Sequence, residues 1–85
     1  MNCSRMQLGT HVRFYRFQMG YSQEQLAEKC NVSARYISNI ENAEGNITMD
    51  TLDVLAVILK VEPYMLLKPY EHGPLPSKIN TKSSL

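Results

Sequence analysis

Residues 21–42 read YSQEQLAEKCNVSARYISNIEN and contain two short helical patterns separated by a tight turn. The first pattern begins at Ser22, and Gln25 follows three residues later. This is the spacing of a capping box, in which the serine hydroxyl and the glutamine side chain each accept a hydrogen bond from an unpaired backbone N–H group. Asn31 follows the pattern, and asparagine tolerates the left-handed backbone that ends a helix abruptly. We therefore predict a helix over residues 22–30, with three side chains facing the core: Leu26, Ala27 and Cys30.

The second pattern begins at Ser33, another residue type that caps helices, and ends near Glu41. Ile37 and Ile40 face inward, and the small side chain of Ala27 lies where the two helices would cross. Three or four residues join the helices, which is the spacing of a helix-turn-helix. In that motif the second helix presents its N-terminal side chains to the DNA major groove. The outward-facing candidates are Ser33, Ala34, Arg35, Tyr36, Ser38 and Asn39.

A longer helix precedes this motif. Apolar residues recur at the i, i+4, i+7 and i+11 spacing of one helical face, and Gly20 follows as a C-cap residue, which predicts a helix over residues 5–19. The apolar face consists of Leu8, Val12, Tyr15 and Met19.

Two more helices are predicted after the motif. Thr48 caps the fourth, and Pro63 suits the first turn of a short fifth helix that ends at Leu67. The core-facing stripe of the fourth helix is Leu52, Leu55, Ala56 and Leu59. The fold class is therefore all-α, with five helices. We expect an N-terminal extension at residues 1–4, one domain at 5–67, and a Pro/Ser-rich tail without a core of its own at 68–85.

Length and composition exclude several classes of protein. The chain has 85 residues, of which 44% are apolar, and a formal net charge of +1, which fits one compact domain. No apolar run approaches the length of a membrane span, and no export signal opens the chain, so we expect a cytoplasmic protein. Only Cys3 and Cys30 are present, and neither shows metal-ligand spacing with His11 or His72. We predict no metal site, no cofactor, no small-molecule ligand and no enzyme, because no catalytic constellation can be assembled.

The stretch YSQEQLAEKCNVSARYISNIEN resembles the phage-repressor type (Cro-like, XRE) of helix-turn-helix domain. The preceding LGTHVRFYR and the following NITMDTLDVLAVILKVEPYMLL are similar to the first, fourth and fifth helices of that family, so the resemblance covers residues 5–67. It implies a compact, lambda-repressor-like, five-helix DNA-binding domain. YISNIEN with NITMDTLDVLA is also similar to the controller proteins of restriction–modification systems, although Gly45 stands where controllers commonly have arginine.

The resemblance implies roles for individual residues. Gln23, at the start of the second helix, would bind a DNA phosphate, although it could also serve only to begin the helix. Arg35, Tyr36 and Asn39 match outward positions of the recognition helix, and we expect Arg35 to contact a base rather than only solvent. Arg16 and Glu41 match a pair that links the first helix to the end of the third.

The electrostatic balance argues against tight binding by one copy. Residues 5–67 contain six Lys/Arg and seven Asp/Glu residues, whereas nucleic-acid-binding domains usually have a basic face. We therefore expect weak non-specific binding, with affinity that depends on specific contacts and on pairing of two copies.

An apolar surface on the fourth and fifth helices predicts where two copies pair. We place Val54, Ile58 and Val61 on the side of the fourth helix that faces away from the core, and Tyr64, Met65 and Leu67 follow closely. These features predict a homodimeric, sequence-specific transcriptional regulator that binds a (pseudo)palindromic operator in double-stranded DNA, in the manner of a controller protein. An antitoxin-like module, which would cover another protein with this apolar surface, is the alternative.

Overall fold

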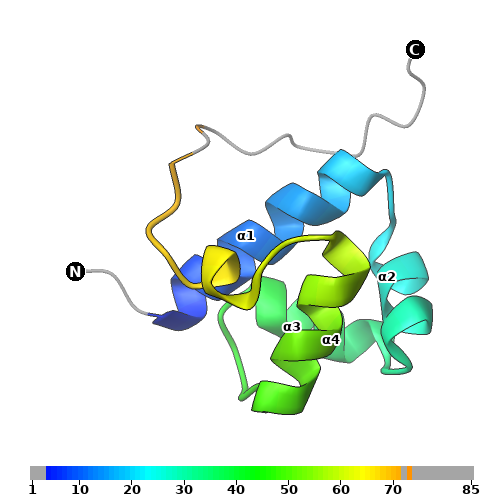
Figure 1. The fold of residues 1–85 in the computed structure, drawn as a ribbon. Helices are drawn as coiled ribbons and strands as arrows, with labels where there is room; N and C mark the ends of the chain where they lie inside the picture. Colours follow the sequence, from blue (N-terminus) through cyan, green and yellow to red (C-terminus); the bar gives the residue numbers. More distant parts are fainter. Residues whose placement is uncertain (1–3, 72, 74–85) are drawn as a thin grey trace.

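The computed structural model describes residues 4–71 and residue 73, and these contain helices and no strand. Four α-helices are followed by one 3₁₀-helix (Figure 1). Their bounds are α1 Ser4–Met19, α2 Gln23–Cys30, α3 Ala34–Glu41, α4 Met49–Leu59 and η1 Pro63–Leu66. The predicted all-α class is confirmed, but four α-helices are present rather than five helices of this kind, because the short fifth helix predicted at residues 63–67 is not an α-helix. It is a single 3₁₀ turn, closed by i to i+3 hydrogen bonds such as that from the Leu67 N–H group to the Tyr64 carbonyl oxygen.

Side-chain caps set where α2, α3 and α4 begin. The capping box of α2 is complete, with the Gln25 N–H group 3.0 Å from Ser22 Oγ and the Ser22 N–H group 2.8 Å from Gln25 Oε1. Asn31 ends α2 in the left-handed conformation at φ 60°. Ser33 and Thr48 accept hydrogen bonds from N–H groups in the first turns of α3 and α4. The predicted caps of these helices are confirmed.

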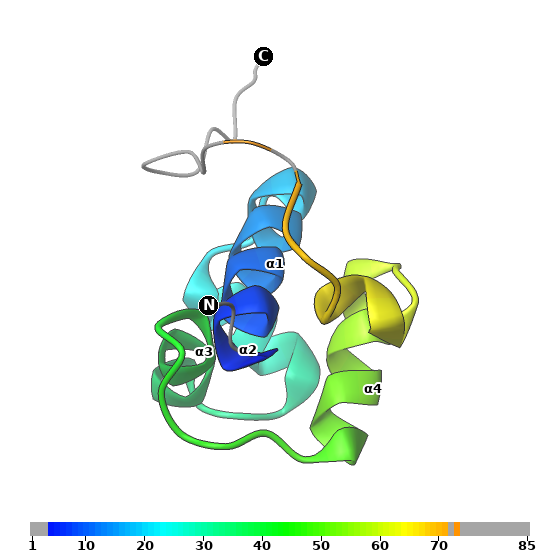
Figure 2. The same ribbon diagram turned by 90° about the vertical axis from the view of Figure 1, so that its left-hand side faces the viewer.

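The core lies where the amphipathic faces of the helices meet. α1 lies between α3 on one side and α4 with η1 on the other (Figure 2). The apolar residues that are buried here are Leu8, Val12, Leu26, Ala27, Cys30, Ile37, Ile40, Leu52, Leu55, Ala56, Leu59 and Leu66. Burial raises the pKa of the Cys30 thiol, which keeps it protonated at neutral pH.

Gly9 allows the closest approach between two helices. A Cβ atom at this position would lie 2.5 Å from the Ile40 carbonyl oxygen and 2.8 Å from that of Glu41. Any side chain here would therefore force the backbones of α1 and α3 apart. Periodicity does not mark Gly9, because glycine is usually unfavourable inside a helix.

Residues that directly follow η1 also contact α1. The Lys68 carbonyl oxygen is 2.9 Å from Nε2 of His11, whose side chain is completely buried. The Tyr70 N–H group donates to Gln7 Oε1 at 2.9 Å, and the Tyr70 ring packs edge-on against His11. Residues 68–70 thus lie across α1, held by contacts with residues about 60 positions earlier in the chain. The prediction of a tail without a core, as far as it concerns residues 74–85, lies outside the described residues.

Residues 4–71 and 73 lack two further features. None of the helices there is long and apolar enough to cross a membrane. No group of three or more His, Cys, Asp or Glu side chains in this part of the chain could hold a metal ion.

Candidate nucleic-acid interface

The predicted groove-facing residues lie together on α3 and its N-cap. Ile37 and Ile40 are buried in the core, so the side chains on the opposite side of α3 form the outer face of the helix. Arg35 is exposed, and its side chain makes no hydrogen bond or ion pair with another residue of the described part of the chain. Of the other candidates, Ser33 is exposed, and four are partly exposed: Ala34, Tyr36, Ser38 and Asn39. The structure therefore brings all six onto one accessible surface.

Tyr36 differs from its neighbours because it also contacts the loop between α3 and α4. Its ring packs against the edge of the core, and its hydroxyl lies 3.5 Å from the backbone oxygen of Asn46. Part of the Tyr36 side chain therefore supports the loop, and only the remainder is accessible.

Glu41, the last residue of α3, forms a buried ion pair with Arg16 of α1. Arg16 Nε lies 2.6 Å from Glu41 Oε2, and Arg16 Nη2 lies 3.0 Å from Oε1. The side chains are only 6% and 0% exposed. Arg16 Nη1 also donates to the Tyr21 carbonyl oxygen at 3.0 Å. This bidentate geometry holds α1, the end of α3 and the start of the α1–α2 turn in one arrangement.

Two further side chains join Glu41, and the sequence did not predict either contact. Gln23, the first residue of α2, donates from Nε2 to Glu41 Oε1 at 3.0 Å, and Arg13 Nε lies 3.4 Å from the same oxygen. Glu41 thus connects the beginning of α2 to the end of α3. Arg13 lies three residues before Arg16, so it lies on the same face of α1, and this spacing is the only sequence signal for its position.

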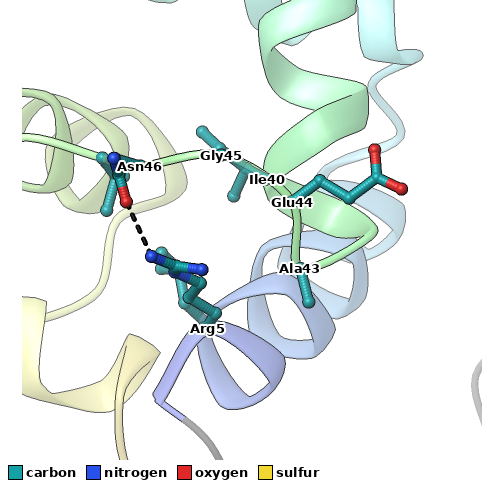
Figure 3. Close-up of a pocket in the computed structure, with 8 residues that line it drawn as sticks. Arg5, Ile40, Ala43, Glu44, Gly45 and Asn46 are labelled. Carbon is teal, nitrogen blue, oxygen red and sulfur yellow. Dashed lines mark hydrogen bonds between the residues drawn. The ribbon is translucent and has the colours of Figure 1, made fainter.

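The loop between α3 and α4 is anchored to α1 by two arginines. Arg5 Nη2 donates to Asn46 Oδ1 at 2.8 Å (Figure 3), and Arg13 Nη2 lies 3.4 Å from Asn42 Oδ1. A hollow of about 140 Å³ lies between Arg5 and this loop. Gly45 adopts φ +74°, which favours glycine at this position.

The predicted pairing surface is accessible only in part. Val54, Tyr64 and Leu67 are 39%, 67% and 41% exposed. Ile58, Val61 and Met65 are partly buried, and Ile58 and Val61 pack against the core, so placing these two opposite the core was wrong.

Helix geometry explains this difference. At about 100° per residue, Ile58 lies only about 60° from Leu55 around α4, whereas Val57 lies on nearly the opposite side. Val57 is 74% exposed and was not included in the predicted surface. We call Val54, Val57, Tyr64 and Leu67 the α4–η1 patch.

Comparison with known proteins identifies similar sequences and folds. A family described as helix-turn-helix matches residues 12–66. A hypothetical transcription factor from Neisseria meningitidis is 35% identical over 76% of this chain and 61% of its own length. The solved structure of that Neisseria factor superposes with a TM-score of 0.76, at 34% identity over 79% of this chain and 77% of that one.

Two other relatives have more specific descriptions. The control protein C.SmaI of Serratia marcescens is 42% identical over 71% of each chain. The transcriptional regulator SinR of Bacillus subtilis is 36% identical over 71% of this chain and 55% of its own length. A structure of SinR in complex with DNA has a TM-score of 0.67, at 35% identity over 72% of this chain and 98% of that one. This chain therefore spans little more than half the length of two of these curated relatives.

Proposed function

Because the chain belongs to the helix-turn-helix family, we propose that it is a sequence-specific, DNA-binding transcriptional regulator that acts as a homodimer. The observation that carries this proposal is the arrangement of α2 and α3. The buried Arg16–Glu41 pair and Gln23 hold these helices together, while the polar outer face of α3 stays accessible. A protein that reads the major groove must hold one face of its recognition helix in a fixed orientation toward the DNA.

In this proposal the two helices have different roles. The outer face of α3 enters the major groove, and Arg35 pairs with a base edge because arginine can donate two parallel hydrogen bonds to guanine. α2 crosses the sugar–phosphate backbone, and Gln23 contacts a phosphate. Its amide nitrogen carries two hydrogens, and Glu41 accepts only one of them, so the second is available.

A second copy of the chain covers the α4–η1 patch. Large apolar side chains are costly to leave in water, and a two-fold interface buries the same patch on both copies. Such a dimer places the two α3 helices about 34 Å apart, the distance between successive major grooves on one side of DNA. Two copies also double the number of cationic contacts, which compensates for the low charge of one domain.

The proposed regulatory role is that of a controller in a restriction–modification operon. The similarity to the control protein C.SmaI, which extends over 71% of both chains, supports this role. A controller role predicts that the purified protein binds DNA upstream of its own gene. It also predicts that this gene lies beside genes for a methyltransferase and an endonuclease.

Selection of bound duplexes from a random pool tests the proposal. We expect enrichment of two related half-sites in inverted orientation, with centres about one helical turn apart. Sedimentation of the protein–DNA complex should give two chains per duplex. Recovery of no preferred sequence would contradict the function. Stable association of this chain with a different protein through the α4–η1 patch, without self-association, would favour the antitoxin-like alternative.

A further inference from the structure

The cluster around Glu41 contains more positive than negative charge. The Glu41 carboxylate accepts hydrogen bonds from Arg13, Arg16 and Gln23. Within residues 4–71 and 73, neither arginine forms an ion pair with a second acidic side chain. One carboxylate therefore faces two guanidinium groups, and one positive charge at this site is not compensated.

The geometry indicates that Arg13 carries the uncompensated charge. Arg16 is buried and makes short, bidentate contacts with Glu41. Arg13 is 34% exposed, and its contacts with Glu41 and Asn42 are both 3.4 Å long, beyond the usual range of N–H···O hydrogen bonds. A long ion pair whose arginine is partly exposed stabilises little, so the Arg13 guanidinium can exchange these contacts for a stronger one.

Arg13 also lies where the proposed DNA backbone would pass. Arg13 and Gln23 donate to the same Glu41 oxygen, so the guanidinium lies beside the first residue of α2. Its other partner, Asn42, directly follows α3. The charge is therefore located between the start of α2 and the end of α3.

We infer that Arg13 binds a phosphate of the DNA backbone beside the start of α2, as a positioning contact supplied by α1. This inference rests on the proposed DNA-binding function and adds a residue outside the two helices of the motif. A phosphate contact carries no sequence information, so Arg13 contributes to affinity and to its salt dependence but not to sequence preference.

The test compares Arg13→Gln with Arg13→Lys and with a matched control, Lys60→Gln, which removes an exposed positive charge at the end of α4. The probe is a 30-base-pair duplex recovered by selection on the wild-type protein, titrated between about 50 and 200 mM salt. For Arg13→Gln, we expect the slope of log affinity against log salt to fall by about 0.9 for each Arg13 phosphate contact that is lost. Arg13→Lys and Lys60→Gln should keep the wild-type slope, and all variants should prefer the same sequence.

Each outcome has a distinct meaning. A wild-type slope in Arg13→Gln would overturn the inference and leave the regulator function intact. A reduced slope in Lys60→Gln as well would also overturn it, because the effect would then come from net charge. Absence of binding by the wild-type protein would reject the DNA-binding function itself. Circular dichroism checks folding, and Arg13→Met, which keeps the apolar stem, replaces Arg13→Gln if that variant does not fold.

Discussion

At the scale of single residues, the proposed function assigns Arg35 and Gln23 two different kinds of DNA contact. Arg35 is exposed on the outer face of α3, where it can reach a base edge, and one bidentate pair with guanine discriminates by about 1–3 kcal/mol. We expect Arg35→Ala to relax the preference at one base pair in each half-site, whereas Gln23→Ala should weaken binding to all sequences alike. Selection from a random pool on both variants measures this. An unchanged preference in Arg35→Ala would transfer the specificity role to Tyr36, Ser38 or Asn39.

Arg16 is buried and stabilises the packing of the helices that carry Arg35 and Gln23 through its ion pair with Glu41. Replacing it with methionine keeps much of the side-chain volume but leaves the buried Glu41 carboxylate without its bidentate partner. Breaking a buried pair in this way costs about 3–5 kcal/mol, whereas an exposed pair costs less than about 1 kcal/mol. Urea denaturation of Arg16→Met measures the loss of unfolding free energy. Arg13→Met is the matched control on the same helix, and a similar small loss in both variants would contradict the assignment of Arg16 as the buried partner.

At the scale of the elements, the contact between α1 and α3 depends on the absence of a side chain at Gly9. In an open helix, Gly→Ala stabilises by about 0.5–1 kcal/mol. Here the added methyl group would lie 2.5 Å from the Ile40 carbonyl oxygen, so we expect Gly9→Ala to lower the melting temperature. Ser38→Ala is the reference variant, because this change at a partly exposed position of α3 adds no atoms that would contact the backbone of another helix. Increased stability of Gly9→Ala would contradict the close approach of the two helices.

At the scale of the whole molecule, the proposed function makes the α4–η1 patch the surface through which two copies associate. Val57 is 74% exposed, and an aspartate there would place a charge within the proposed apolar interface. We expect Val57→Asp to sediment as a monomer and to lose most of its affinity for a two-half-site duplex. Met6→Asp, at a 55% exposed position on α1, is the control and should remain dimeric. A dimeric Val57→Asp protein would remove the patch as the interface.

The starts of α2, α3 and α4, the ends of α2 and α3 and most of the core could be predicted from the sequence, because these features depend on neighbours within one or two helical turns. Ser22, Ser33 and Thr48 cap N–H groups only a few residues away, and Asn31 ends α2 through its own backbone conformation. The 3.6-residue period likewise identifies the buried faces of α1 to α4 without knowledge of what covers them. The same local information places the candidate DNA contacts on one face of α3.

Other features depend on residues that only the tertiary fold brings together. Gln23 meets Glu41 across 18 positions, His11 meets Lys68 across 57, and Gly9 is needed only because α3 passes against it. No periodic pattern encodes such pairs, since their distances follow from the angles at which helices pack. The accessible side of α4 is not such a feature, because the spacing of about 100° between helical residues by itself places Ile58 beside Leu55 and Val57 on nearly the opposite side. Local chemistry therefore specifies the helices of this protein, and helix packing specifies which side chains support or border the proposed DNA-binding surface.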